Sequence, residues 1–183
     1  MTEQIKSLEQ QIEKLKEELA TARQNAPREA VDDFEFQTSD GPVQLSALFG
    51  EKDELIVVHN MGKNCSYCTL WADGLNGHTK HYEDRAAFVV CTPDSIEVQK
   101  EFADSRGWKF RMVSDDSKAF SKAVGFWTED SGWWPGSSTF VREDGKMYRT
   151  GSVIFGPGDD FCGIWPMMDL LGGPKGWEPK TTY

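Results

Sequence analysis

Two cysteines, Cys65 and Cys68, follow the apolar run Leu55 to Val58, and this spacing constrains the fold more than any other feature of the chain. The apolar run predicts a buried strand, and the cysteines then lie at the start of a helix. The positive N-terminal end of a helix favours thiolate over thiol and can lower a cysteine pKa from about 8.5 to roughly 3.5–7.5. Two intervening residues leave the second thiol close enough to attack a mixed disulfide formed by the first. The spacing therefore predicts a redox-active dithiol.

A zinc half-site and a pair of structural cysteines are the alternatives to this redox role. Tetrahedral zinc needs a second Cys or His pair at similar spacing, and the other two cysteines, Cys91 and Cys162, stand alone in the sequence. His78 and His81 belong to a different segment. The pattern thus favours redox chemistry without a metal or another cofactor. We expect Cys91 to be buried and inert and Cys162 to pack among apolar neighbours, with a role as a third redox partner as the alternative.

The composition predicts a single domain with an appendage and limits the class of partner. The chain has 183 residues, 38% of them hydrophobic, and no stretch approaches the roughly 20 apolar residues that span a bilayer. Four cysteines and the absence of an export-signal pattern predict a cytoplasmic protein whose thiols are kept reduced. A net charge of −10 argues against nucleic acid and anionic membranes as partners.

Residues 2 to about 24 predict an amphipathic helix, and we divide the chain into this helix (1–26) and a second domain (27–183). The apolar positions follow a heptad pattern, with steps of three and four residues: Ile5, Leu8, Ile12, Leu15 and Leu19. Isoleucine at a-like positions and leucine at the d-like ones favour a parallel two-stranded coil, and hence a homodimer. Packing of the helix on its own domain is an equally good interpretation, because the repeat is short.

Beyond this helix the chain alternates strand and helix patterns. We expect strands at 34–38, 55–58, 87–91 and 110–113, a return strand from Val43 towards Phe49, and a hairpin of 139–142 with 147–150. We expect helices from Cys65 to Arg85 with a weak point at Gly74 and Gly77, from an N-cap at Asp94 to Ser105, at 116–124, and at 160–171. This order predicts an α/β domain with a mixed central sheet flanked by helices, as in the thioredoxin-like fold.

Three segments resemble a thioredoxin-like family of predicted dithiol–disulfide oxidoreductases that is filed as a domain of unknown function. They are Leu55 to His59, the string Cys-Ser-Tyr-Cys-Thr-Leu-Trp-Ala-Asp-Gly from Cys65 to Gly74, and Ala86 to Asp94. The resemblance covers about residues 30 to 175 and leaves out the N-terminal helix. It implies a thiol–disulfide oxidoreductase acting on a disulfide-containing protein or a small-molecule thiol, although the family's substrates are unassigned. For Asp73 we expect helix solvation or contact with an Arg or Lys, since it lies too far along the helix to tune Cys65.

The resemblance to thioredoxin itself also suggests further site residues. A thioredoxin has a buried acid six residues before the nucleophile, and His59 stands at that position here, as a candidate to assist proton transfer at Cys68. A histidine at a strand end that is satisfied by the backbone is the alternative. Thioredoxins also carry a cis-proline opposite the cysteines; here Ser137 or Ser138 takes that place, after Pro135.

Two other functions compete with the dithiol oxidoreductase. Peroxiredoxins, which share an N-terminal hairpin like the one expected from Phe34 to Phe49, have a proline and a Thr or Ser where this chain has Val58 and Gly62, so efficient peroxide reduction is not expected. The other is a redox-inactive adaptor that binds through the heptad helix and a tryptophan-rich face. Trp133 and Trp134 would lie near the cysteines in either case, because they precede the segment that should face them.

Overall fold

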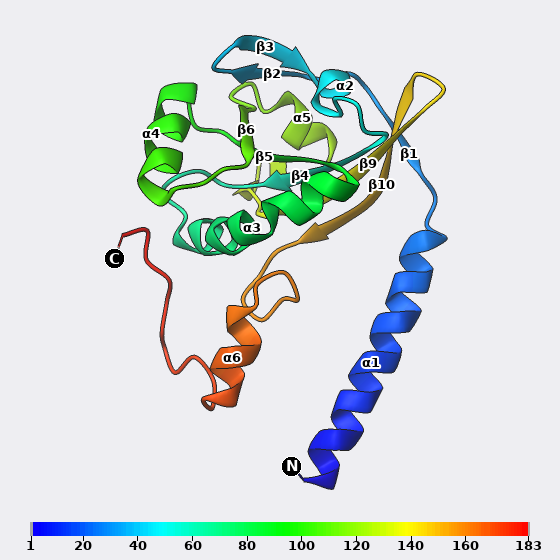
Figure 1. The fold of residues 1–183 in the computed structure, drawn as a ribbon, viewed down its shortest axis with the longest axis vertical. Helices are drawn as coiled ribbons and strands as arrows, with labels where there is room; N and C mark the ends of the chain where they lie inside the picture. The colour runs from blue at the N-terminus through cyan, green and yellow to red at the C-terminus, as the bar shows by residue number, and fades with distance from the viewer. Residues whose placement is uncertain (1, 183) are drawn as a thin grey trace.

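The computed structural model describes residues 2–182, which form one eight-stranded sheet, a separate two-stranded sheet and six helices (Figure 1). The strands of the large sheet are β1 (Glu29–Val31), β2 (Glu35–Thr38), β3 (Gly41–Gln44), β4 (Glu54–His59), β5 (Ala87–Thr92), β6 (Arg111–Ser114), β9 (Gly136–Glu143) and β10 (Lys146–Ile154). The two-stranded sheet pairs β7 (Trp127–Thr128) with β8 (Gly132–Trp133). The helices are α1 (Glu3–Gln24), α2 (Leu45–Leu48), α3 (Ser66–Arg85), α4 (Ile96–Arg106), α5 (Ala119–Ala123) and α6 (Ile164–Leu170).

The large sheet is mixed, in the order β1-β10-β9-β4-β5-β6-β2-β3. Strands β4, β5 and β6 are parallel and are connected by α3 and α4, whereas β9 pairs antiparallel with β4. Val57 of β4 lies opposite Val89 on one side and Ser138 on the other. The strand is apolar from Leu55 to Val58 because helices cover both faces of the sheet, as the buried run in the sequence predicts. The expected mixed α/β sheet with an additional N-terminal helix is confirmed.

Alternate residues of β4 point into two separate cores. Leu55 and Val57 belong to a core that also contains residues of α2 and α5. Val58 belongs to the second core, which is formed with residues of α3 and α4. A residue of β4, or of the loop after it, can therefore reach the cysteines on α3 only if its side chain lies on the face that α3 covers.

Helix α1 extends away from the body of the fold (Figure 1). Thr2 caps it by accepting a hydrogen bond from the Ile5 N–H at 3.3 Å, and none of its residues is buried. The five apolar residues of the heptad stripe are 45–62% exposed. An ion pair of 2.7 Å between Lys16 and Asp160 links the helix to the segment before α6. The predicted helix is confirmed, and the division of the chain at residue 26 stays a prediction.

Several predicted elements differ in detail from the structure. Helix α3 runs without interruption through Gly74 and Gly77, since both glycines have helical neighbours and neither has a positive φ. The N-cap of α4 is Ser95 rather than Asp94, whose carboxylate instead accepts a hydrogen bond from the Lys63 N–H at 2.7 Å.

Other differences concern short elements, whose patterns are too brief to be recognised in a sequence. The chain after β3 forms the single-turn helix α2 instead of continuing as a strand, and α5 and α6 are shorter than expected. The chain after α1 enters strand β1 at Glu29, which pairs with Arg149 of β10. The small hairpin of β7 and β8 was not predicted.

Candidate active site

The cysteine pair stands at the N-terminal end of α3, where Cys65 is the N-cap. Its extended backbone, with φ −91° and ψ 103°, lets the Cys65 Sγ accept a hydrogen bond from the Cys68 N–H at 3.0 Å. Both thiols are free; Cys65 is partly exposed, whereas Cys68 is only 2% exposed. The Cys65 sulfur is thus accessible to a substrate, whereas the Cys68 sulfur is buried.

The environment separates the acidities of the two thiols. The pKa of Cys65 is lowered from 9.0 to about 7, first by a hydrogen bond from the Cys68 thiol and then by the backbone N–H groups of Cys68 and Tyr67, against the opposing effect of burial. The pKa of Cys68 is raised, because its proton is shared with Cys65 and because burial disfavours the charged form. Near neutral pH, Cys65 is therefore partly thiolate and Cys68 is a thiol.

The loop before the pair is held by Asn60, which sequence reasoning missed. The Asn60 Oδ1 accepts from the Gly62 N–H at 2.8 Å, and the Gly62 carbonyl accepts from the Cys65 N–H at 3.1 Å. The Asn60 side chain also reaches the Cys68 carbonyl at 3.5 Å, and the Met61 N–H points to the Cys68 sulfur at 3.4 Å. Strand alternation was the available signal, since it places residue 60 rather than 59 on the α3 side.

Gly62 occupies a position that no larger residue fits without strain. Its φ is +97°, and a Cβ built on it would lie 2.8 Å and 2.9 Å from the two carboxylate oxygens of Asp94. This is the position at which peroxiredoxins have the Thr or Ser. In this loop conformation a Thr or Ser at position 62 would have a strained backbone and would crowd the Asp94 carboxylate.

His59 lies on the opposite face of the sheet from α3. Its ring stacks on Phe126, with centroids 3.6 Å apart, and its Nε2 is 2.9 Å from the Ser138 Oγ. Burial first, and then the charge of Arg149, lower the pKa of His59 to about 3, so the ring is neutral at physiological pH. The structure does not bring His59 to Cys68 and so corrects the proton-transfer role inferred from the spacing. It also differs from the alternative, because the partner of Nε2 is a side chain, and the buried Nδ1 has no hydrogen-bond partner among residues 2–182.

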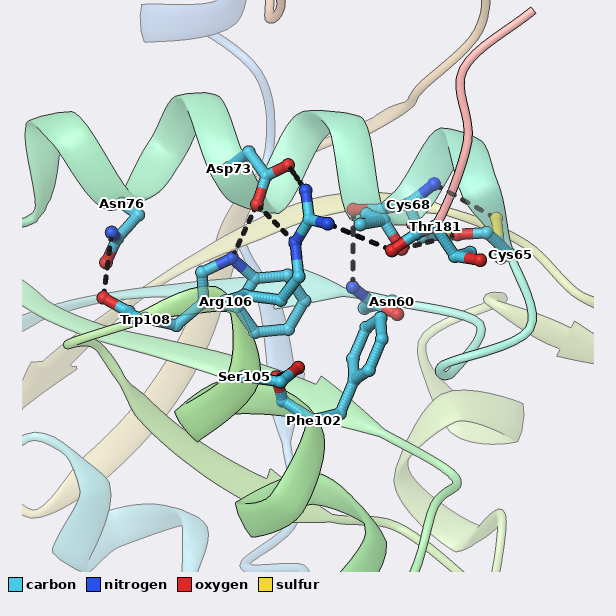
Figure 2. A network of polar contacts seen from close by, with 12 residues as sticks. Asn60, Cys65, Cys68, Asp73, Asn76, Phe102, Ser105, Arg106, Trp108 and Thr181 are labelled. Carbon is cyan, nitrogen blue, oxygen red and sulfur yellow. Dashed lines mark hydrogen bonds and ion pairs between the residues drawn. The ribbon is translucent and has the colours of Figure 1, made fainter. Parts of the chain in front are cut away.

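The Asp73 of the cysteine motif joins α3 to the end of α4 (Figure 2). Its carboxylate forms an ion pair with Arg106 and accepts a hydrogen bond from the Trp108 Nε1 at 2.8 Å. Arg106 also donates to the Thr181 carbonyl at 2.9 Å and so fastens the C-terminal segment beside α3. The expected contact of Asp73 with an arginine is confirmed, and its role here is to hold elements together.

An apolar groove of about 420 Å³ opens beside Cys65. Aromatic side chains supply five of its lining residues: Tyr67, Trp71, Trp133, Trp134 and Phe155. Met61, Pro135 and Pro157 are the other apolar residues, and Cys65 and Ser131 are the polar ones. The segment Trp133 to Pro135 thus lies at the cysteines, as its place in the sequence suggests.

The segment after the groove departs from the thioredoxin pattern as expected. The Ser138 side chain turns to His59, while the Ser137 Oγ donates to the Val57 carbonyl at 3.2 Å. The peptide bond before Pro135 is trans, as are all others between residues 2 and 182.

The two remaining cysteines are buried away from solvent. Cys91 is 2% exposed and Cys162 is 6% exposed, and burial raises the pKa of each thiol. Cys162 packs in the same core as Trp71 and Trp165. Within residues 2–182, no three His, Cys, Asp or Glu side chains gather where they could hold a metal ion, and no helix is long and apolar enough to cross a membrane.

Comparison with solved structures defines the class of the fold. The chain is similar to peroxidoxin BcpB from Mycobacterium tuberculosis, with a TM-score of 0.53, 23% identity and coverage of 69% of this chain and 80% of that one. It is similar to peroxiredoxin Q from Xanthomonas campestris, with a TM-score of 0.57, 14% identity and coverage of 82% and 93%. For AhpC from Enterococcus faecalis the TM-score is 0.59, the identity 17% and the coverage 79% and 90%. The fold is therefore thioredoxin-like, of the kind found in peroxiredoxins.

The particular family is defined by the sequence. Residues 2–182 match the family of bacterial proteins of unknown function DUF899, and the chain belongs to it. The match includes α1, which the resemblance seen in the sequence had left out. Among curated proteins, the sequence has no match.

Proposed function

We propose that this protein is a thiol–disulfide oxidoreductase that uses Cys65 as nucleophile and Cys68 as resolving thiol. The observation that carries the proposal is the pairing of a partly exposed Cys65, whose pKa is lowered to about 7, with a buried Cys68 that donates to it. A thiolate that is accessible near neutral pH attacks disulfides, and a neighbouring thiol that is still protonated can resolve the mixed disulfide in a second step.

The reaction moves two electrons from the dithiol to the substrate. The Cys65 thiolate attacks one sulfur of a substrate disulfide, which forms a mixed disulfide and releases the other substrate sulfur as a thiolate. Cys68 then loses its proton to solvent or to the released thiolate and attacks the Cys65 sulfur. A Cys65–Cys68 disulfide forms, the second substrate thiolate leaves, and an external dithiol is needed to restore the starting state. In the opposite direction the same steps oxidise a dithiol.

The substrate that we propose is a disulfide, in a protein or a small molecule, rather than a peroxide. The peroxiredoxin names of the structural neighbours make peroxide the obvious rival. Gly62 argues against it, since the hydroxyl that peroxiredoxins place there has no room beside Asp94. Incubation with hydrogen peroxide and with a peptide disulfide, with the Cys65–Cys68 bond quantified by mass spectrometry over time, distinguishes the two.

The test of the function is a trapping experiment with a matched control. Cys68→Ser should accumulate mixed disulfides through Cys65, and wild-type protein should catalyse insulin reduction by dithiothreitol, whereas Cys65→Ser should do neither. Equal insulin reduction by wild type and Cys65→Ser would contradict the proposal. That result would favour the adaptor, for which the exposed stripe of α1 is the supporting observation, and a tightly bound zinc would favour the metal site.

We further propose that α1 pairs with α1 of a second copy to form a parallel homodimer. Its apolar stripe is about half exposed in the single chain, and soluble proteins seldom leave a contiguous patch uncovered. In a parallel coil, Glu18 would face Arg23 of the partner subunit, which complements the stripe with opposite charges. Light scattering of the full chain and of a chain starting at Arg28 tests this pairing. A full-length monomer at micromolar concentration would rule it out, whereas a dimer lost on truncation supports it.

We propose the cytoplasm as the location of the protein, because thiols are kept reduced there.

A further inference from the structure

We propose that the apolar groove beside Cys65 selects uncharged disulfides with an aromatic or other apolar group next to the sulfur, and disfavours anionic ones such as glutathione disulfide. The inference rests on the proposed dithiol function and assigns it a class of substrate. Three features carry it: the walls of the groove, its floor and its lack of cations.

Two elements that are far apart in the sequence build the walls. Tyr67 comes from the first turn of α3, just after Cys65, and Trp133 and Trp134 come from β8 and the residue after it. The main chain holds the second wall in place, because the Trp134 N–H donates to the Phe126 carbonyl at 2.8 Å. Trp134 is nevertheless 43% exposed, so its ring offers apolar surface that nothing in the chain covers.

Buried aromatic rings form the floor of the groove. The rings of Trp71 and Phe155 are 5.4 Å apart, and both residues are almost fully buried, at 3% and 5% exposure. The Phe155 N–H donates to the Pro135 carbonyl at 2.9 Å, which ties the floor to the second wall. A groove with such supports is formed before the ligand arrives, and its volume of about 420 Å³ is within the range typical of small-ligand sites.

The side chains that line the groove include no lysine, arginine or histidine. Apart from Cys65, which is partly thiolate near neutral pH, the lining residues are uncharged, so a ligand carboxylate finds no cation among them. The turn between β7 and β8 carries two exposed carboxylates next to Ser131: Asp130, and Glu129, which forms an ion pair with Lys122 at 3.5 Å. Asp159 lies behind Trp71 and accepts a hydrogen bond from its Nε1 at 3.4 Å, and the whole chain carries a net charge of −10. An anionic disulfide therefore finds no compensating cation among the residues that line the groove.

The position of Cys65 on the lining gives the groove its effect on rate. When an apolar side chain of the substrate lies in the groove, it holds the neighbouring substrate sulfur next to the Cys65 thiolate. The attack on the disulfide is then a reaction between groups that are already positioned. Burial of one aromatic side chain is enough to change the rate about tenfold, if roughly half of its transfer free energy is realised at the transition state.

The experiment compares two blocked, uncharged peptide disulfides that differ only in Phe or Ser next to the cysteine. Reduced full-length protein is mixed with each peptide, the reaction is stopped with acid, and the Cys65–Cys68 bond is quantified by mass spectrometry. We expect the Phe peptide to react about tenfold faster than the Ser peptide. Trp134→Ala should remove most of this preference. Trp127→Ala is the matched control, since Trp127 belongs to the same hairpin but packs under Lys118 and Lys122 instead of lining the groove.

A second variant tests the charge argument without removing an aromatic residue. Ser131→Lys should accelerate the reaction with glutathione disulfide and leave the preference for Phe over Ser intact. Equal rates of the two peptides, an unchanged preference in Trp134→Ala, or an equal loss in Trp127→Ala would each overturn the proposed selection. If neither peptide nor glutathione disulfide oxidises the cysteine pair, the dithiol function itself fails, which is a different outcome from loss of selectivity.

Discussion

The hydrogen bond from Cys68 to Cys65 makes a quantitative prediction about the acidity of the nucleophile. Cys68→Ala removes the thiol that donates to Cys65, which is the largest single cause of its lowered pKa. Cys68→Ser replaces that thiol with a hydroxyl, which also donates. The two substitutions therefore remove the same resolving sulfur and differ in the hydrogen bond alone.

The magnitude follows from the pKa of about 7 in the intact pair and the ordinary value of 9.0. A pKa near 7 leaves about half of Cys65 as thiolate at neutral pH, and a pKa near 9 leaves about 1%. The backbone N–H groups of Cys68 and Tyr67 remain in the Ala variant, so its pKa should lie between these values, whereas the Ser variant should stay near 7. The reactivity of Cys65 increases as the pH rises through its pKa, because the thiol loses its proton and the thiolate is the nucleophile.

The assay is alkylation of Cys65 with iodoacetamide at a series of pH values, followed by peptide mass spectrometry. The midpoint of the rate against pH is a better measure than the rate at one pH, because a thiolate of higher pKa is also a stronger nucleophile and partly offsets its lower population. The other cysteines of the wild-type chain are at most 6% exposed, so Cys65 should dominate the labelling.

Two results would refute this reasoning. A wild-type midpoint near 9 would show that the start of α3 does not acidify Cys65. Equal midpoints for the Ala and Ser variants would show that the side chain at position 68 is not the donor.

Three further predictions concern the surroundings of the pair. Gly62→Ala should lower the free energy of unfolding, measured by urea titration, by about 1–3 kcal/mol, because φ is +97° at this position. The control Gly74→Ala lies in open space on α3 and should raise this free energy by about 0.5–1 kcal/mol. A Gly62→Ala protein as stable as wild type would contradict the prediction. Asp73→Asn removes the carboxylate that joins α3 to α4 and should cost about 1–3 kcal/mol in the same titration, since the ion pair is only partly shielded from water. His59→Asn should leave the midpoint of Cys65 alkylation unchanged, because the histidine is neutral and lies on the other face of the sheet; a shifted midpoint would contradict this separation of His59 from the cysteine pair.

The sequence predicted the elements whose signals are local. The apolar run before Cys65 and the Cys-x-x-Cys spacing were sufficient to predict β4, the start of α3 and the dithiol, since strand burial and helix position act over a few residues. The heptad period was sufficient for α1. The same alternation that identifies β4 also assigns Asn60 to the α3 face, so this residue could have been predicted from the sequence. Counting six residues back from Cys65, as in thioredoxin, selected His59 instead, which lies on the other face.

Only the tertiary structure decided which distant segments meet at the cysteines. Trp134 reaches the groove because β9 pairs with β4, which brings residues about seventy positions apart in the chain to one edge of the site. Arg106 meets Asp73 because α3 and α4 cover the same face of the sheet, and Asp94 closes the space beside Gly62 because β5 is the neighbour of β4. Periodicity reports which side of an element is apolar, but the contacts of a site depend on strand order and register, which long-range pairing determines.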